Sequence, residues 1–346
     1  MSGWPAHTLI ATAAALSAGL TACVVDQPDA PADLAAAPPP KPATADGPRP
    51  DPATGYSSGT LGEGLHWIGN GAYMVMVMEG PDGVALVDAP PSLDGVLARA
   101  VGDLTGGREV THIIYSHHHG DHIGAAGRFQ NVRTIAHART ARELERGTPC
   151  ADCTAVPDPR PLPDTEFETA FRLDLGGGQV LDLAYHGPNH AVGNIFIHAP
   201  KQGALMVVDV AYPGYVPFDL LAVSADIPGY RAALDTILDY DFEVFVGGHV
   251  ARPGTRADVE ANRDYVADVA DAAARALADN PRGEVIPPLA RAHPDADGWW
   301  LTDSHTRAVV DQCAREVRKR WEGRLAGVAT YADSHCRRMQ FSLRID

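Results

Sequence analysis

The strongest structural signal in this chain is a run of histidines that follows a short apolar stretch. The run is Ser116-His117-His118-His119-Gly120-Asp121-His122. It has the form His-x-His-x-Asp-His and directly follows residues 110–115, whose side chains favour a β-strand. Two histidines at alternate positions after a strand can turn toward one point, and Gly120 lets the backbone turn sharply before the next polar pair. Imidazole and carboxylate groups bind zinc, iron and manganese, so the pattern predicts a metal site.

The other histidines of the chain do not share this spacing. For the run itself, the alternative to a metal site is a solvated histidine-rich loop. Within the run, His118 occupies the variable position, and its side chain is expected to point away from the metal. Histidines in or beside predicted strands are expected to be structural or surface residues; these are His112, His137, His186 and His198. Spacing suggests no partner for His66, His293, His305 and His335.

Length and composition restrict the class of protein. A chain of 346 residues predicts about two domains, or one large domain with appendages. The hydrophobic fraction of 45% and the charged fraction of 21% are typical of a globular chain with a sizeable core. The formal net charge of −16 disfavours a nucleic-acid partner, because an acidic surface repels phosphates. No apolar run reaches the roughly 18 residues of a membrane-spanning helix, which excludes a polytopic membrane protein.

The N-terminal region has the composition of an export signal and a tether. Residues 8–22 are apolar and have the length of a signal-peptide core. They end in Leu20-Thr21-Ala22-Cys23, which resembles the bacterial lipobox, although no Lys or Arg precedes Lys41. A short buried helix is the alternative. We expect a signal peptide at residues 1–23 and a disordered Pro/Ala-rich linker at residues 24–58. The exported protein would reside in the periplasm or be anchored to the outer membrane as a lipoprotein, and that anchor would be its only membrane contact.

The cysteines agree with export. They are Cys23, Cys150, Cys153, Cys313 and Cys336. Without the lipobox cysteine, four remain, an even number that favours disulfides in an oxidising compartment. Of the three possible pairings we favour Cys150–Cys153 with Cys313–Cys336, because the members of each pair are close in sequence. Free buried thiols, or half of a zinc knuckle at Cys150 and Cys153, are the alternatives, but the chain has no second Cys-x-x-Cys.

Three later polar residues also follow predicted strands. They are His190 after residues 180–185, Asp209 after residues 204–208 and His249 after residues 244–246. Together with the histidine run, they resemble the metallo-β-lactamase superfamily in order and separation. The resemblance covers about residues 60–255. It implies an α/β fold, namely a four-layer αββα sandwich of two face-to-face sheets with helices outside and a metal site at one edge.

The resemblance also implies the ligands. His117, His119 and His190 would hold the first ion; Asp121, His122 and His249 would hold the second; and Asp209 would bridge them. Two divalent metal ions are expected, with Zn²⁺ favoured and Fe or Mn as alternatives. Asp121 is a catalytic candidate as a proton acceptor. Tyr212, three residues after Asp209, is the second catalytic candidate, because lactonases of the family have a tyrosine there that contacts the substrate oxygen; a packing role is the alternative.

These features predict a binuclear metallo-hydrolase that uses a metal-bound hydroxide on a small ester, lactone or amide substrate. An aspartate at position 209 favours a lactonase or thioesterase type, since lactamases of the family generally lack it. The alternatives are a β-lactamase, a mono-iron sulfur dioxygenase and a non-catalytic metal-binding protein. The expected partner is a small-molecule substrate, with no nucleic acid.

The remaining pattern gives domain limits and helices. We expect a catalytic domain at residues 59–280 and a C-terminal helical extension at residues 281–346. Helices are predicted at residues 92–104, 255–280 and 299–325, with a break at residues 281–288. The apolar residues 213–222 are expected to form a lid or substrate wall.

Overall fold

The structure, a computed structural model, describes residues 39–147 and 160–346. The expected signal peptide with Cys23 and the expected Cys150–Cys153 pair lie outside the described residues. Part of the predicted linker is described, and it packs on the body instead of remaining free. Ala45 is 1% exposed, and Arg252 donates hydrogen bonds to the carbonyl oxygen of Thr44. Within the described residues, no helix combines the length and apolar character needed to cross a membrane.

The first sheet has seven strands that lie side by side in chain order. They are β1 (Ser57–Gly62), β2 (Leu65–Gly69), β3 (Met74–Gly80), β4 (Gly83–Val87), β5 (His112–Ile114), β6 (Arg133–His137) and β7 (Thr165–Phe167). Strands β1 to β4 form an antiparallel meander, whereas β4 to β7 are parallel. Parallel pairing aligns the carboxyl ends of β4, β5 and β6. The histidine run therefore emerges at one edge of the sheet, directly after β5.

The second sheet has five strands in the order β12-β11-β10-β9-β8. They are β8 (Ala170–Asp174), β9 (Val180–Ala184), β10 (Phe196–Ala199), β11 (Ala204–Met206) and β12 (Val244–Val246). The pair β11 and β12 is parallel, so the residues that follow these two strands, Asp209 and His249 among them, leave the sheet in the same direction.

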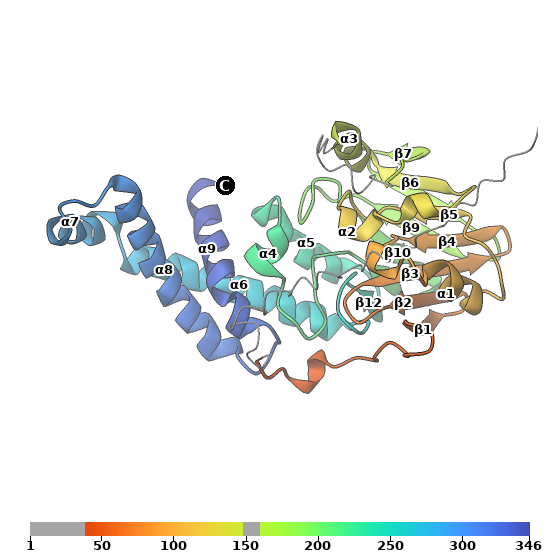
Figure 1. Ribbon diagram of the computed structural model, residues 1–346, viewed down its shortest axis with the longest axis horizontal. Helices are drawn as coiled ribbons and strands as arrows, with labels where there is room; N and C mark the ends of the chain where they lie inside the picture. Colours follow the sequence, from red (N-terminus) through yellow and green to blue (C-terminus); the bar gives the residue numbers. More distant parts are fainter. Residues whose placement is uncertain (1–38, 148–159) are drawn as a thin grey trace, which may run out of the picture. The chain divides into compact units, whose positions relative to one another are not determined.

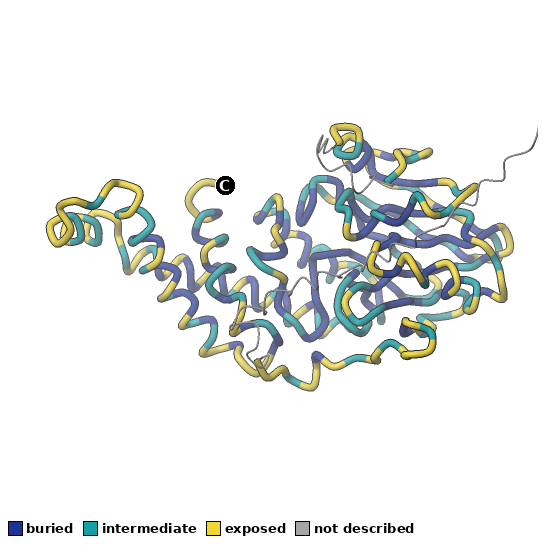
Figure 2. Tube along the Cα trace, viewed as in Figure 1, coloured by how far each residue is buried: buried dark blue, intermediate teal, exposed yellow. Residues whose placement is uncertain are grey.

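Three apolar clusters show the layering. The middle cluster joins side chains of both sheets, such as Met76 and Ile114 from the first and Leu183 and Met206 from the second. The outer face of the first sheet packs on α1 (Leu97–Leu104). The outer face of the second sheet packs on α5 (Ile227–Asp239) and α6 (Arg256–Asp279). This is the predicted αββα sandwich, and Figures 1 and 2 show its sheets between helices with the buried residues between the layers.

The helix predicted at residues 92–104 begins later than expected. Residues Pro91–Leu93 form a 3-10 turn, and α1 starts only at Leu97. The hydroxyl oxygen of Ser92, in this turn, accepts a hydrogen bond from Asn70 at 3.0 Å. Gly95 lies in the first turn of the predicted helix, and glycine disfavours α-helix.

The C-terminal helices extend the outer layer of the second sheet. Helix α6 begins at the predicted place, with Thr255 and Asp258 forming a capping box. The break predicted at residues 281–288 is limited to the start of that range, because α7 (Arg282–Ala292) contains Pro287 and Pro288. Helix α8 (Gly298–Trp321) ends before the predicted limit, and α9 (Val328–Ile345), which the sequence pattern did not indicate, follows it.

These helices share one core with the sandwich. A single cluster contains Phe245 of β12, Tyr265 of α6, Trp321 of α8 and Met339 of α9. The predicted limit at residue 280 thus falls within a continuous core. The expected Cys313–Cys336 disulfide is present and joins α8 to α9.

Loss of this disulfide should destabilise the fold. The bond closes a loop with a sequence separation of 23 residues, and chain entropy predicts a contribution of roughly 3 kcal/mol for a loop of this size. We expect Cys313→Ala to lower the free energy of unfolding by about that amount, measured by urea denaturation under non-reducing conditions. An unchanged midpoint would show that the bond does not constrain the chain.

Candidate metal centre

Seven side chains from separate parts of the chain meet at one edge of the two sheets. His117 and His119 lie after β5, and Asp121 and His122 lie in α2 (Gly120–Ile123). The other three come from loops of the second sheet: His190 between β9 and β10, Asp209 after β11, and His249 after β12. They form two groups, His117 with His119, His190 and Asp209, and Asp121 with His122 and His249. In each group the ligand atoms lie within 4.8 Å of one another.

The carboxylate of Asp209 lies between the two groups. Its Oδ2 atom is 3.1 Å from Nε2 of His190 and 3.6 Å from Nε2 of His117 on one side. The same atom is 3.0 Å from Nε2 of His122, and Oδ1 is 2.9 Å from Nε2 of His249, on the other side. A carboxylate with two oxygens in this position can bind a cation in each group.

The donor atoms fit divalent cations. Nε2 of His117 is buried and finds no hydrogen-bond partner among the described residues. Nδ1 of His119 faces Nε2 of His190 at 3.0 Å, and Nε2 of His122 faces Nε2 of His249 at 3.0 Å. Ring nitrogens that face one another around a carboxylate are the donor set of a site for zinc or a similar ion.

Neighbouring residues hold two of the imidazoles in the required tautomer. Ser116 donates a hydrogen bond from its hydroxyl to Asp88 Oδ2 at 2.7 Å, so the hydroxyl oxygen accepts one from Nδ1 of His117 at 2.9 Å. Nδ1 of His249 donates to the carbonyl oxygen of Ala72 at 3.1 Å. Both arrangements leave the Nε2 lone pair directed at the centre, as partners of metal-binding histidines commonly do.

The charge state of the centre also suits cations. Burial, together with neighbouring imidazoles, lowers the pKa of His117 well below its usual value and that of His119 to about 4, so both rings are neutral. Burial opposes the charge on Asp209, but the imidazoles of His122, His190 and His249 outweigh it and hold the carboxyl pKa well below normal. Burial also lowers the pKa of His122, yet nearby carboxylates, Asp209 foremost, raise it to about 9. A cation would compete with that proton for the same nitrogen.

Two tyrosines contact the carboxylates of the centre. Tyr212, 5% exposed, donates a hydrogen bond to Asp209 Oδ1 at 3.1 Å. The hydroxyl of Tyr212 therefore contacts a clustered residue, the central carboxylate of Asp209. Tyr73 donates to Asp121 Oδ2 at 3.2 Å. Burial and nearby Asp121 raise the pKa of Tyr73 to about 12, so it stays a proton donor.

Backbone conformation turns two of the carboxylates inward. Asp88, after β4, and Asp209, after β11, have φ values of 64° and 63°. Left-handed conformations are disfavoured for residues with a Cβ atom, and they persist where the surroundings hold them. The amide of Asp88 donates to the carbonyl oxygen of Ile114 at 2.9 Å, and that of Asp209 donates to Gly247 at 3.1 Å.

Sequence reasoning named all seven clustered residues and Tyr212, but it missed Asp88, Ser116 and Tyr73. Asp88 and Tyr73 lie at strand ends of the first sheet, and Ser116 opens the histidine run. Their one sequence signal as site residues was a polar side chain next to a predicted strand. His118 contributes no atom to either cluster.

Comparisons with known proteins identify a matching family. The profile of the metallo-beta-lactamase superfamily matches residues 68–249, which include all seven clustered residues. No curated protein matches the chain. The structure is similar to a metallo-beta-lactamase from Pontibacter korlensis, with 16% identity, a TM-score of 0.49, and coverage of 60% of this chain and 97% of that one. It is also similar to a metallo-beta-lactamase from Hirschia baltica, with 19% identity, a TM-score of 0.47, and coverage of 60% and 96%.

The family profile spans more than half of the 346 residues. It begins in β2 and ends at His249, so it includes both sheets' site-forming loops. The chain belongs to the metallo-β-lactamase superfamily.

Proposed function

We propose that this protein is a binuclear metal-dependent hydrolase that cleaves a small ester, lactone or amide. The observation that carries the proposal is the position of Asp209, whose two oxygens face both groups of imidazoles. His117, His119 and His190 would hold one cation, and Asp121, His122 and His249 the other. Bound divalent cations at such a site, zinc in particular, lower the pKa of water and stabilise negative charge on oxygen.

The residues of the chain supply positioning and proton transfer. Asp121 is the most exposed clustered carboxylate, with 49% of its side chain accessible against 5% for Asp209. It is therefore the group that can accept a proton from an attacking water and pass it to the leaving group. Tyr73 would orient Asp121 through its hydrogen bond, and Tyr212 would do the same for Asp209.

The second group of ligands favours a hydrolase over a mono-iron sulfur dioxygenase. A mono-iron sulfur dioxygenase would need only the group of His117, His119, His190 and Asp209, whereas a further three ligands converge beside it. An aspartate at position 209 supports a lactonase or thioesterase type over a β-lactamase.

We also propose that the protein is exported, and that it is anchored through Cys23. The Cys313–Cys336 disulfide supports export, because structural disulfides persist in oxidising compartments.

Removal of the central carboxylate charge should reduce metal binding. We expect the purified protein to bind about two equivalents of zinc and Asp209→Asn to bind about one, because the amide cannot bridge two cations. Metal content after equilibrium dialysis measures this. Asp182→Asn is the control, since Asp182 pairs with Arg172 on the exposed face of β9. Equal zinc content in Asp209→Asn and the parent protein would contradict the bridging role.

A substrate panel tests the reaction class. With zinc bound, we expect turnover of chromogenic esters and lactones, loss of turnover with a chelator, and recovery on addition of zinc. Cephalosporin hydrolysis should be slower by comparison. Preferential hydrolysis of the cephalosporin would favour a β-lactamase, and a fully metallated protein without turnover of any compound would refute the hydrolase.

Tyr212→Phe distinguishes two roles for the hydroxyl. Loss of its hydrogen bond to Asp209 should weaken zinc affinity roughly tenfold, as is typical for partners of metal ligands. Competition with a chromogenic chelator gives the affinity. Tyr215→Phe is the matched control, because its hydroxyl faces Lys41 instead. Unchanged zinc affinity with a reduced kcat would instead support direct contact with the substrate.

A further inference from the structure

Residues 213–223, here called the wall segment, are fastened to the metal centre at both ends. Before the segment, Tyr212 donates to Asp209. After it, the amide of Ala225 donates to the carbonyl oxygen of His190 at 2.9 Å. Both ends of the wall segment therefore lie next to clustered residues. Phe218 and Val223 of this segment are 56% and 58% exposed.

The C-terminal helices hold the backbone of the wall segment. The amide of Val216 donates to Ala326 at 3.0 Å, and the amide of Ala326 donates to Gly214 at 2.9 Å. Asn262 of α6, fully buried, accepts from the amide of Tyr212 and donates to its carbonyl oxygen, each at 3.1 Å. The segment is thus positioned by residues outside the range that matches the family profile.

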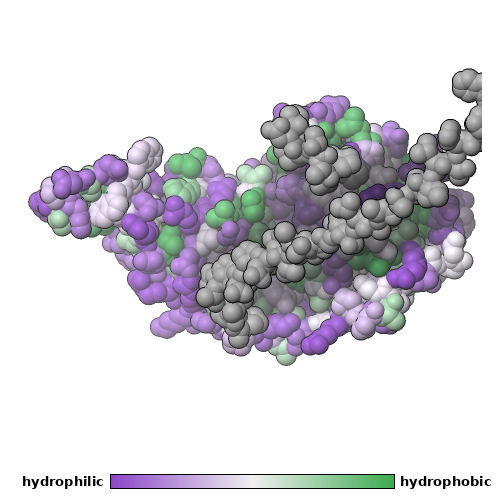
Figure 3. Space-filling model, in the orientation of Figure 1, coloured by the Kyte–Doolittle hydropathy of each residue, from purple (hydrophilic) through white to green (hydrophobic). Residues whose placement is uncertain are grey.

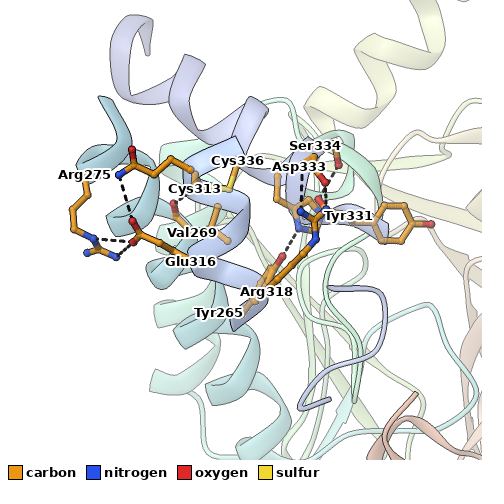
Figure 4. The surroundings of a disulfide bond; sticks show 12 residues. Tyr265, Val269, Arg275, Cys313, Glu316, Arg318, Tyr331, Asp333, Ser334 and Cys336 are labelled. Carbon is orange, nitrogen blue, oxygen red and sulfur yellow. Dashed lines mark hydrogen bonds and ion pairs between the residues drawn. A yellow bond between two sulfur atoms is a disulfide. The ribbon is translucent and has the colours of Figure 1, made fainter. Parts of the chain in front are cut away.

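His335 of α9 makes the central contact. It is fully buried, and burial lowers its pKa to about 4, so the ring is neutral. Tyr265 donates a hydrogen bond to its Nδ1 at 2.7 Å, so Nε2 carries the hydrogen and donates to the carbonyl oxygen of Phe218 at 3.1 Å. The adjacent Ser334 accepts from the amide of Leu220 at 3.2 Å. Figure 4 shows Ser334 and Cys336 on this helix, with Cys336 bonded to Cys313 of α8.

The backbone next to this contact is strained. Four successive residues, Leu220 to Val223, have φ values between 51° and 60°. They form a left-handed turn within α4 (Asp219–Val223), a conformation that residues with a Cβ atom avoid. Such turns persist only when the surrounding structure fixes them, and they concentrate at ligand-binding and active sites. His335 and Ser334 supply that fixation here.

We propose that Phe218 and Val223 form an apolar wall beside the metal centre, and that His335 is the positioning residue that holds this wall in place. The enzyme would then favour substrates with an apolar acyl chain over those with a small acyl group. Figure 3 shows apolar surface over α4 and near the end of α9. The proposal rests on the proposed hydrolase function.

The test compares 4-nitrophenyl octanoate with 4-nitrophenyl acetate in the zinc-loaded full chain. We expect the ratio of kcat/KM values, octanoate over acetate, to fall about tenfold in His335→Ala, chiefly through KM, because a loosened wall loses apolar contact. His335→Gln should restore the ratio, since the Gln amide nitrogen can replace Nε2 as donor. His305→Ala is the matched control: His305 is also buried in the extension and bonds a backbone carbonyl, that of Asn280, away from the wall segment. Zinc content should be equal in all variants.

A ratio in His335→Ala equal to that of the parent protein, or an equal fall in His305→Ala, would overturn the proposal. If the parent protein cleaves neither ester, the proposed function fails for this substrate class, and the positioning role is tested without activity. Hydrogen exchange of the amides of Leu220 and Ala222 should then be at least tenfold faster in His335→Ala, and unchanged in His305→Ala. Equal protection in all three proteins would refute the role of His335.

Discussion

The carboxylate of Asp209 is the interaction on which the centre depends. Four imidazoles from three loops and one short helix approach its two oxygens, at distances from 2.9 to 3.6 Å. These imidazoles would repel one another if several carried a proton. Because the centre is buried, water cannot screen that repulsion. Cations in place of protons would let the charged carboxylate and the neutral imidazoles share one centre. The strained backbone at Asp209 places the carboxylate there, and both sheets contribute to holding it.

The sandwich and the C-terminal helices position different parts of the site. The two sheets align the ends of β4, β5, β11 and β12, so ligands far apart in the sequence meet at one edge. The helices α6, α8 and α9 extend the core behind the second sheet and hold residues 212–223 through Asn262 and His335. The clustered residues therefore follow from the common fold, whereas residues 212–223 are held in part by side chains beyond the family profile.

The sandwich and the clustered residues were predicted from a resemblance to the metallo-β-lactamase superfamily, which the histidine run and three later polar residues at strand ends carry. The sequence did not predict the hydrogen-bond partners. Ser116 and Asp88 act on His117 only because β4 and β5 are adjacent, and Tyr73 reaches Asp121 only through the pairing of Tyr73 with His249. His335 had no partner by spacing, since its contacts with Tyr265 and Phe218 span 70 and 117 residues. Gly95 falls in the first turn of the helix predicted at residues 92–104, and α1 starts only after it. Gly323 and Gly327, between α8 and α9, are a local signal of a helix end that the prediction at residues 299–325 did not use.

The central claim is that one carboxylate bridges two cations. A crystal structure of the zinc-loaded protein, with anomalous diffraction recorded on both sides of the zinc absorption edge, tests it most directly. The account predicts two anomalous peaks, one among His117, His119 and His190 and one among Asp121, His122 and His249, with Asp209 contacting both. A single peak, or two peaks with Asp209 turned away from either, would contradict it.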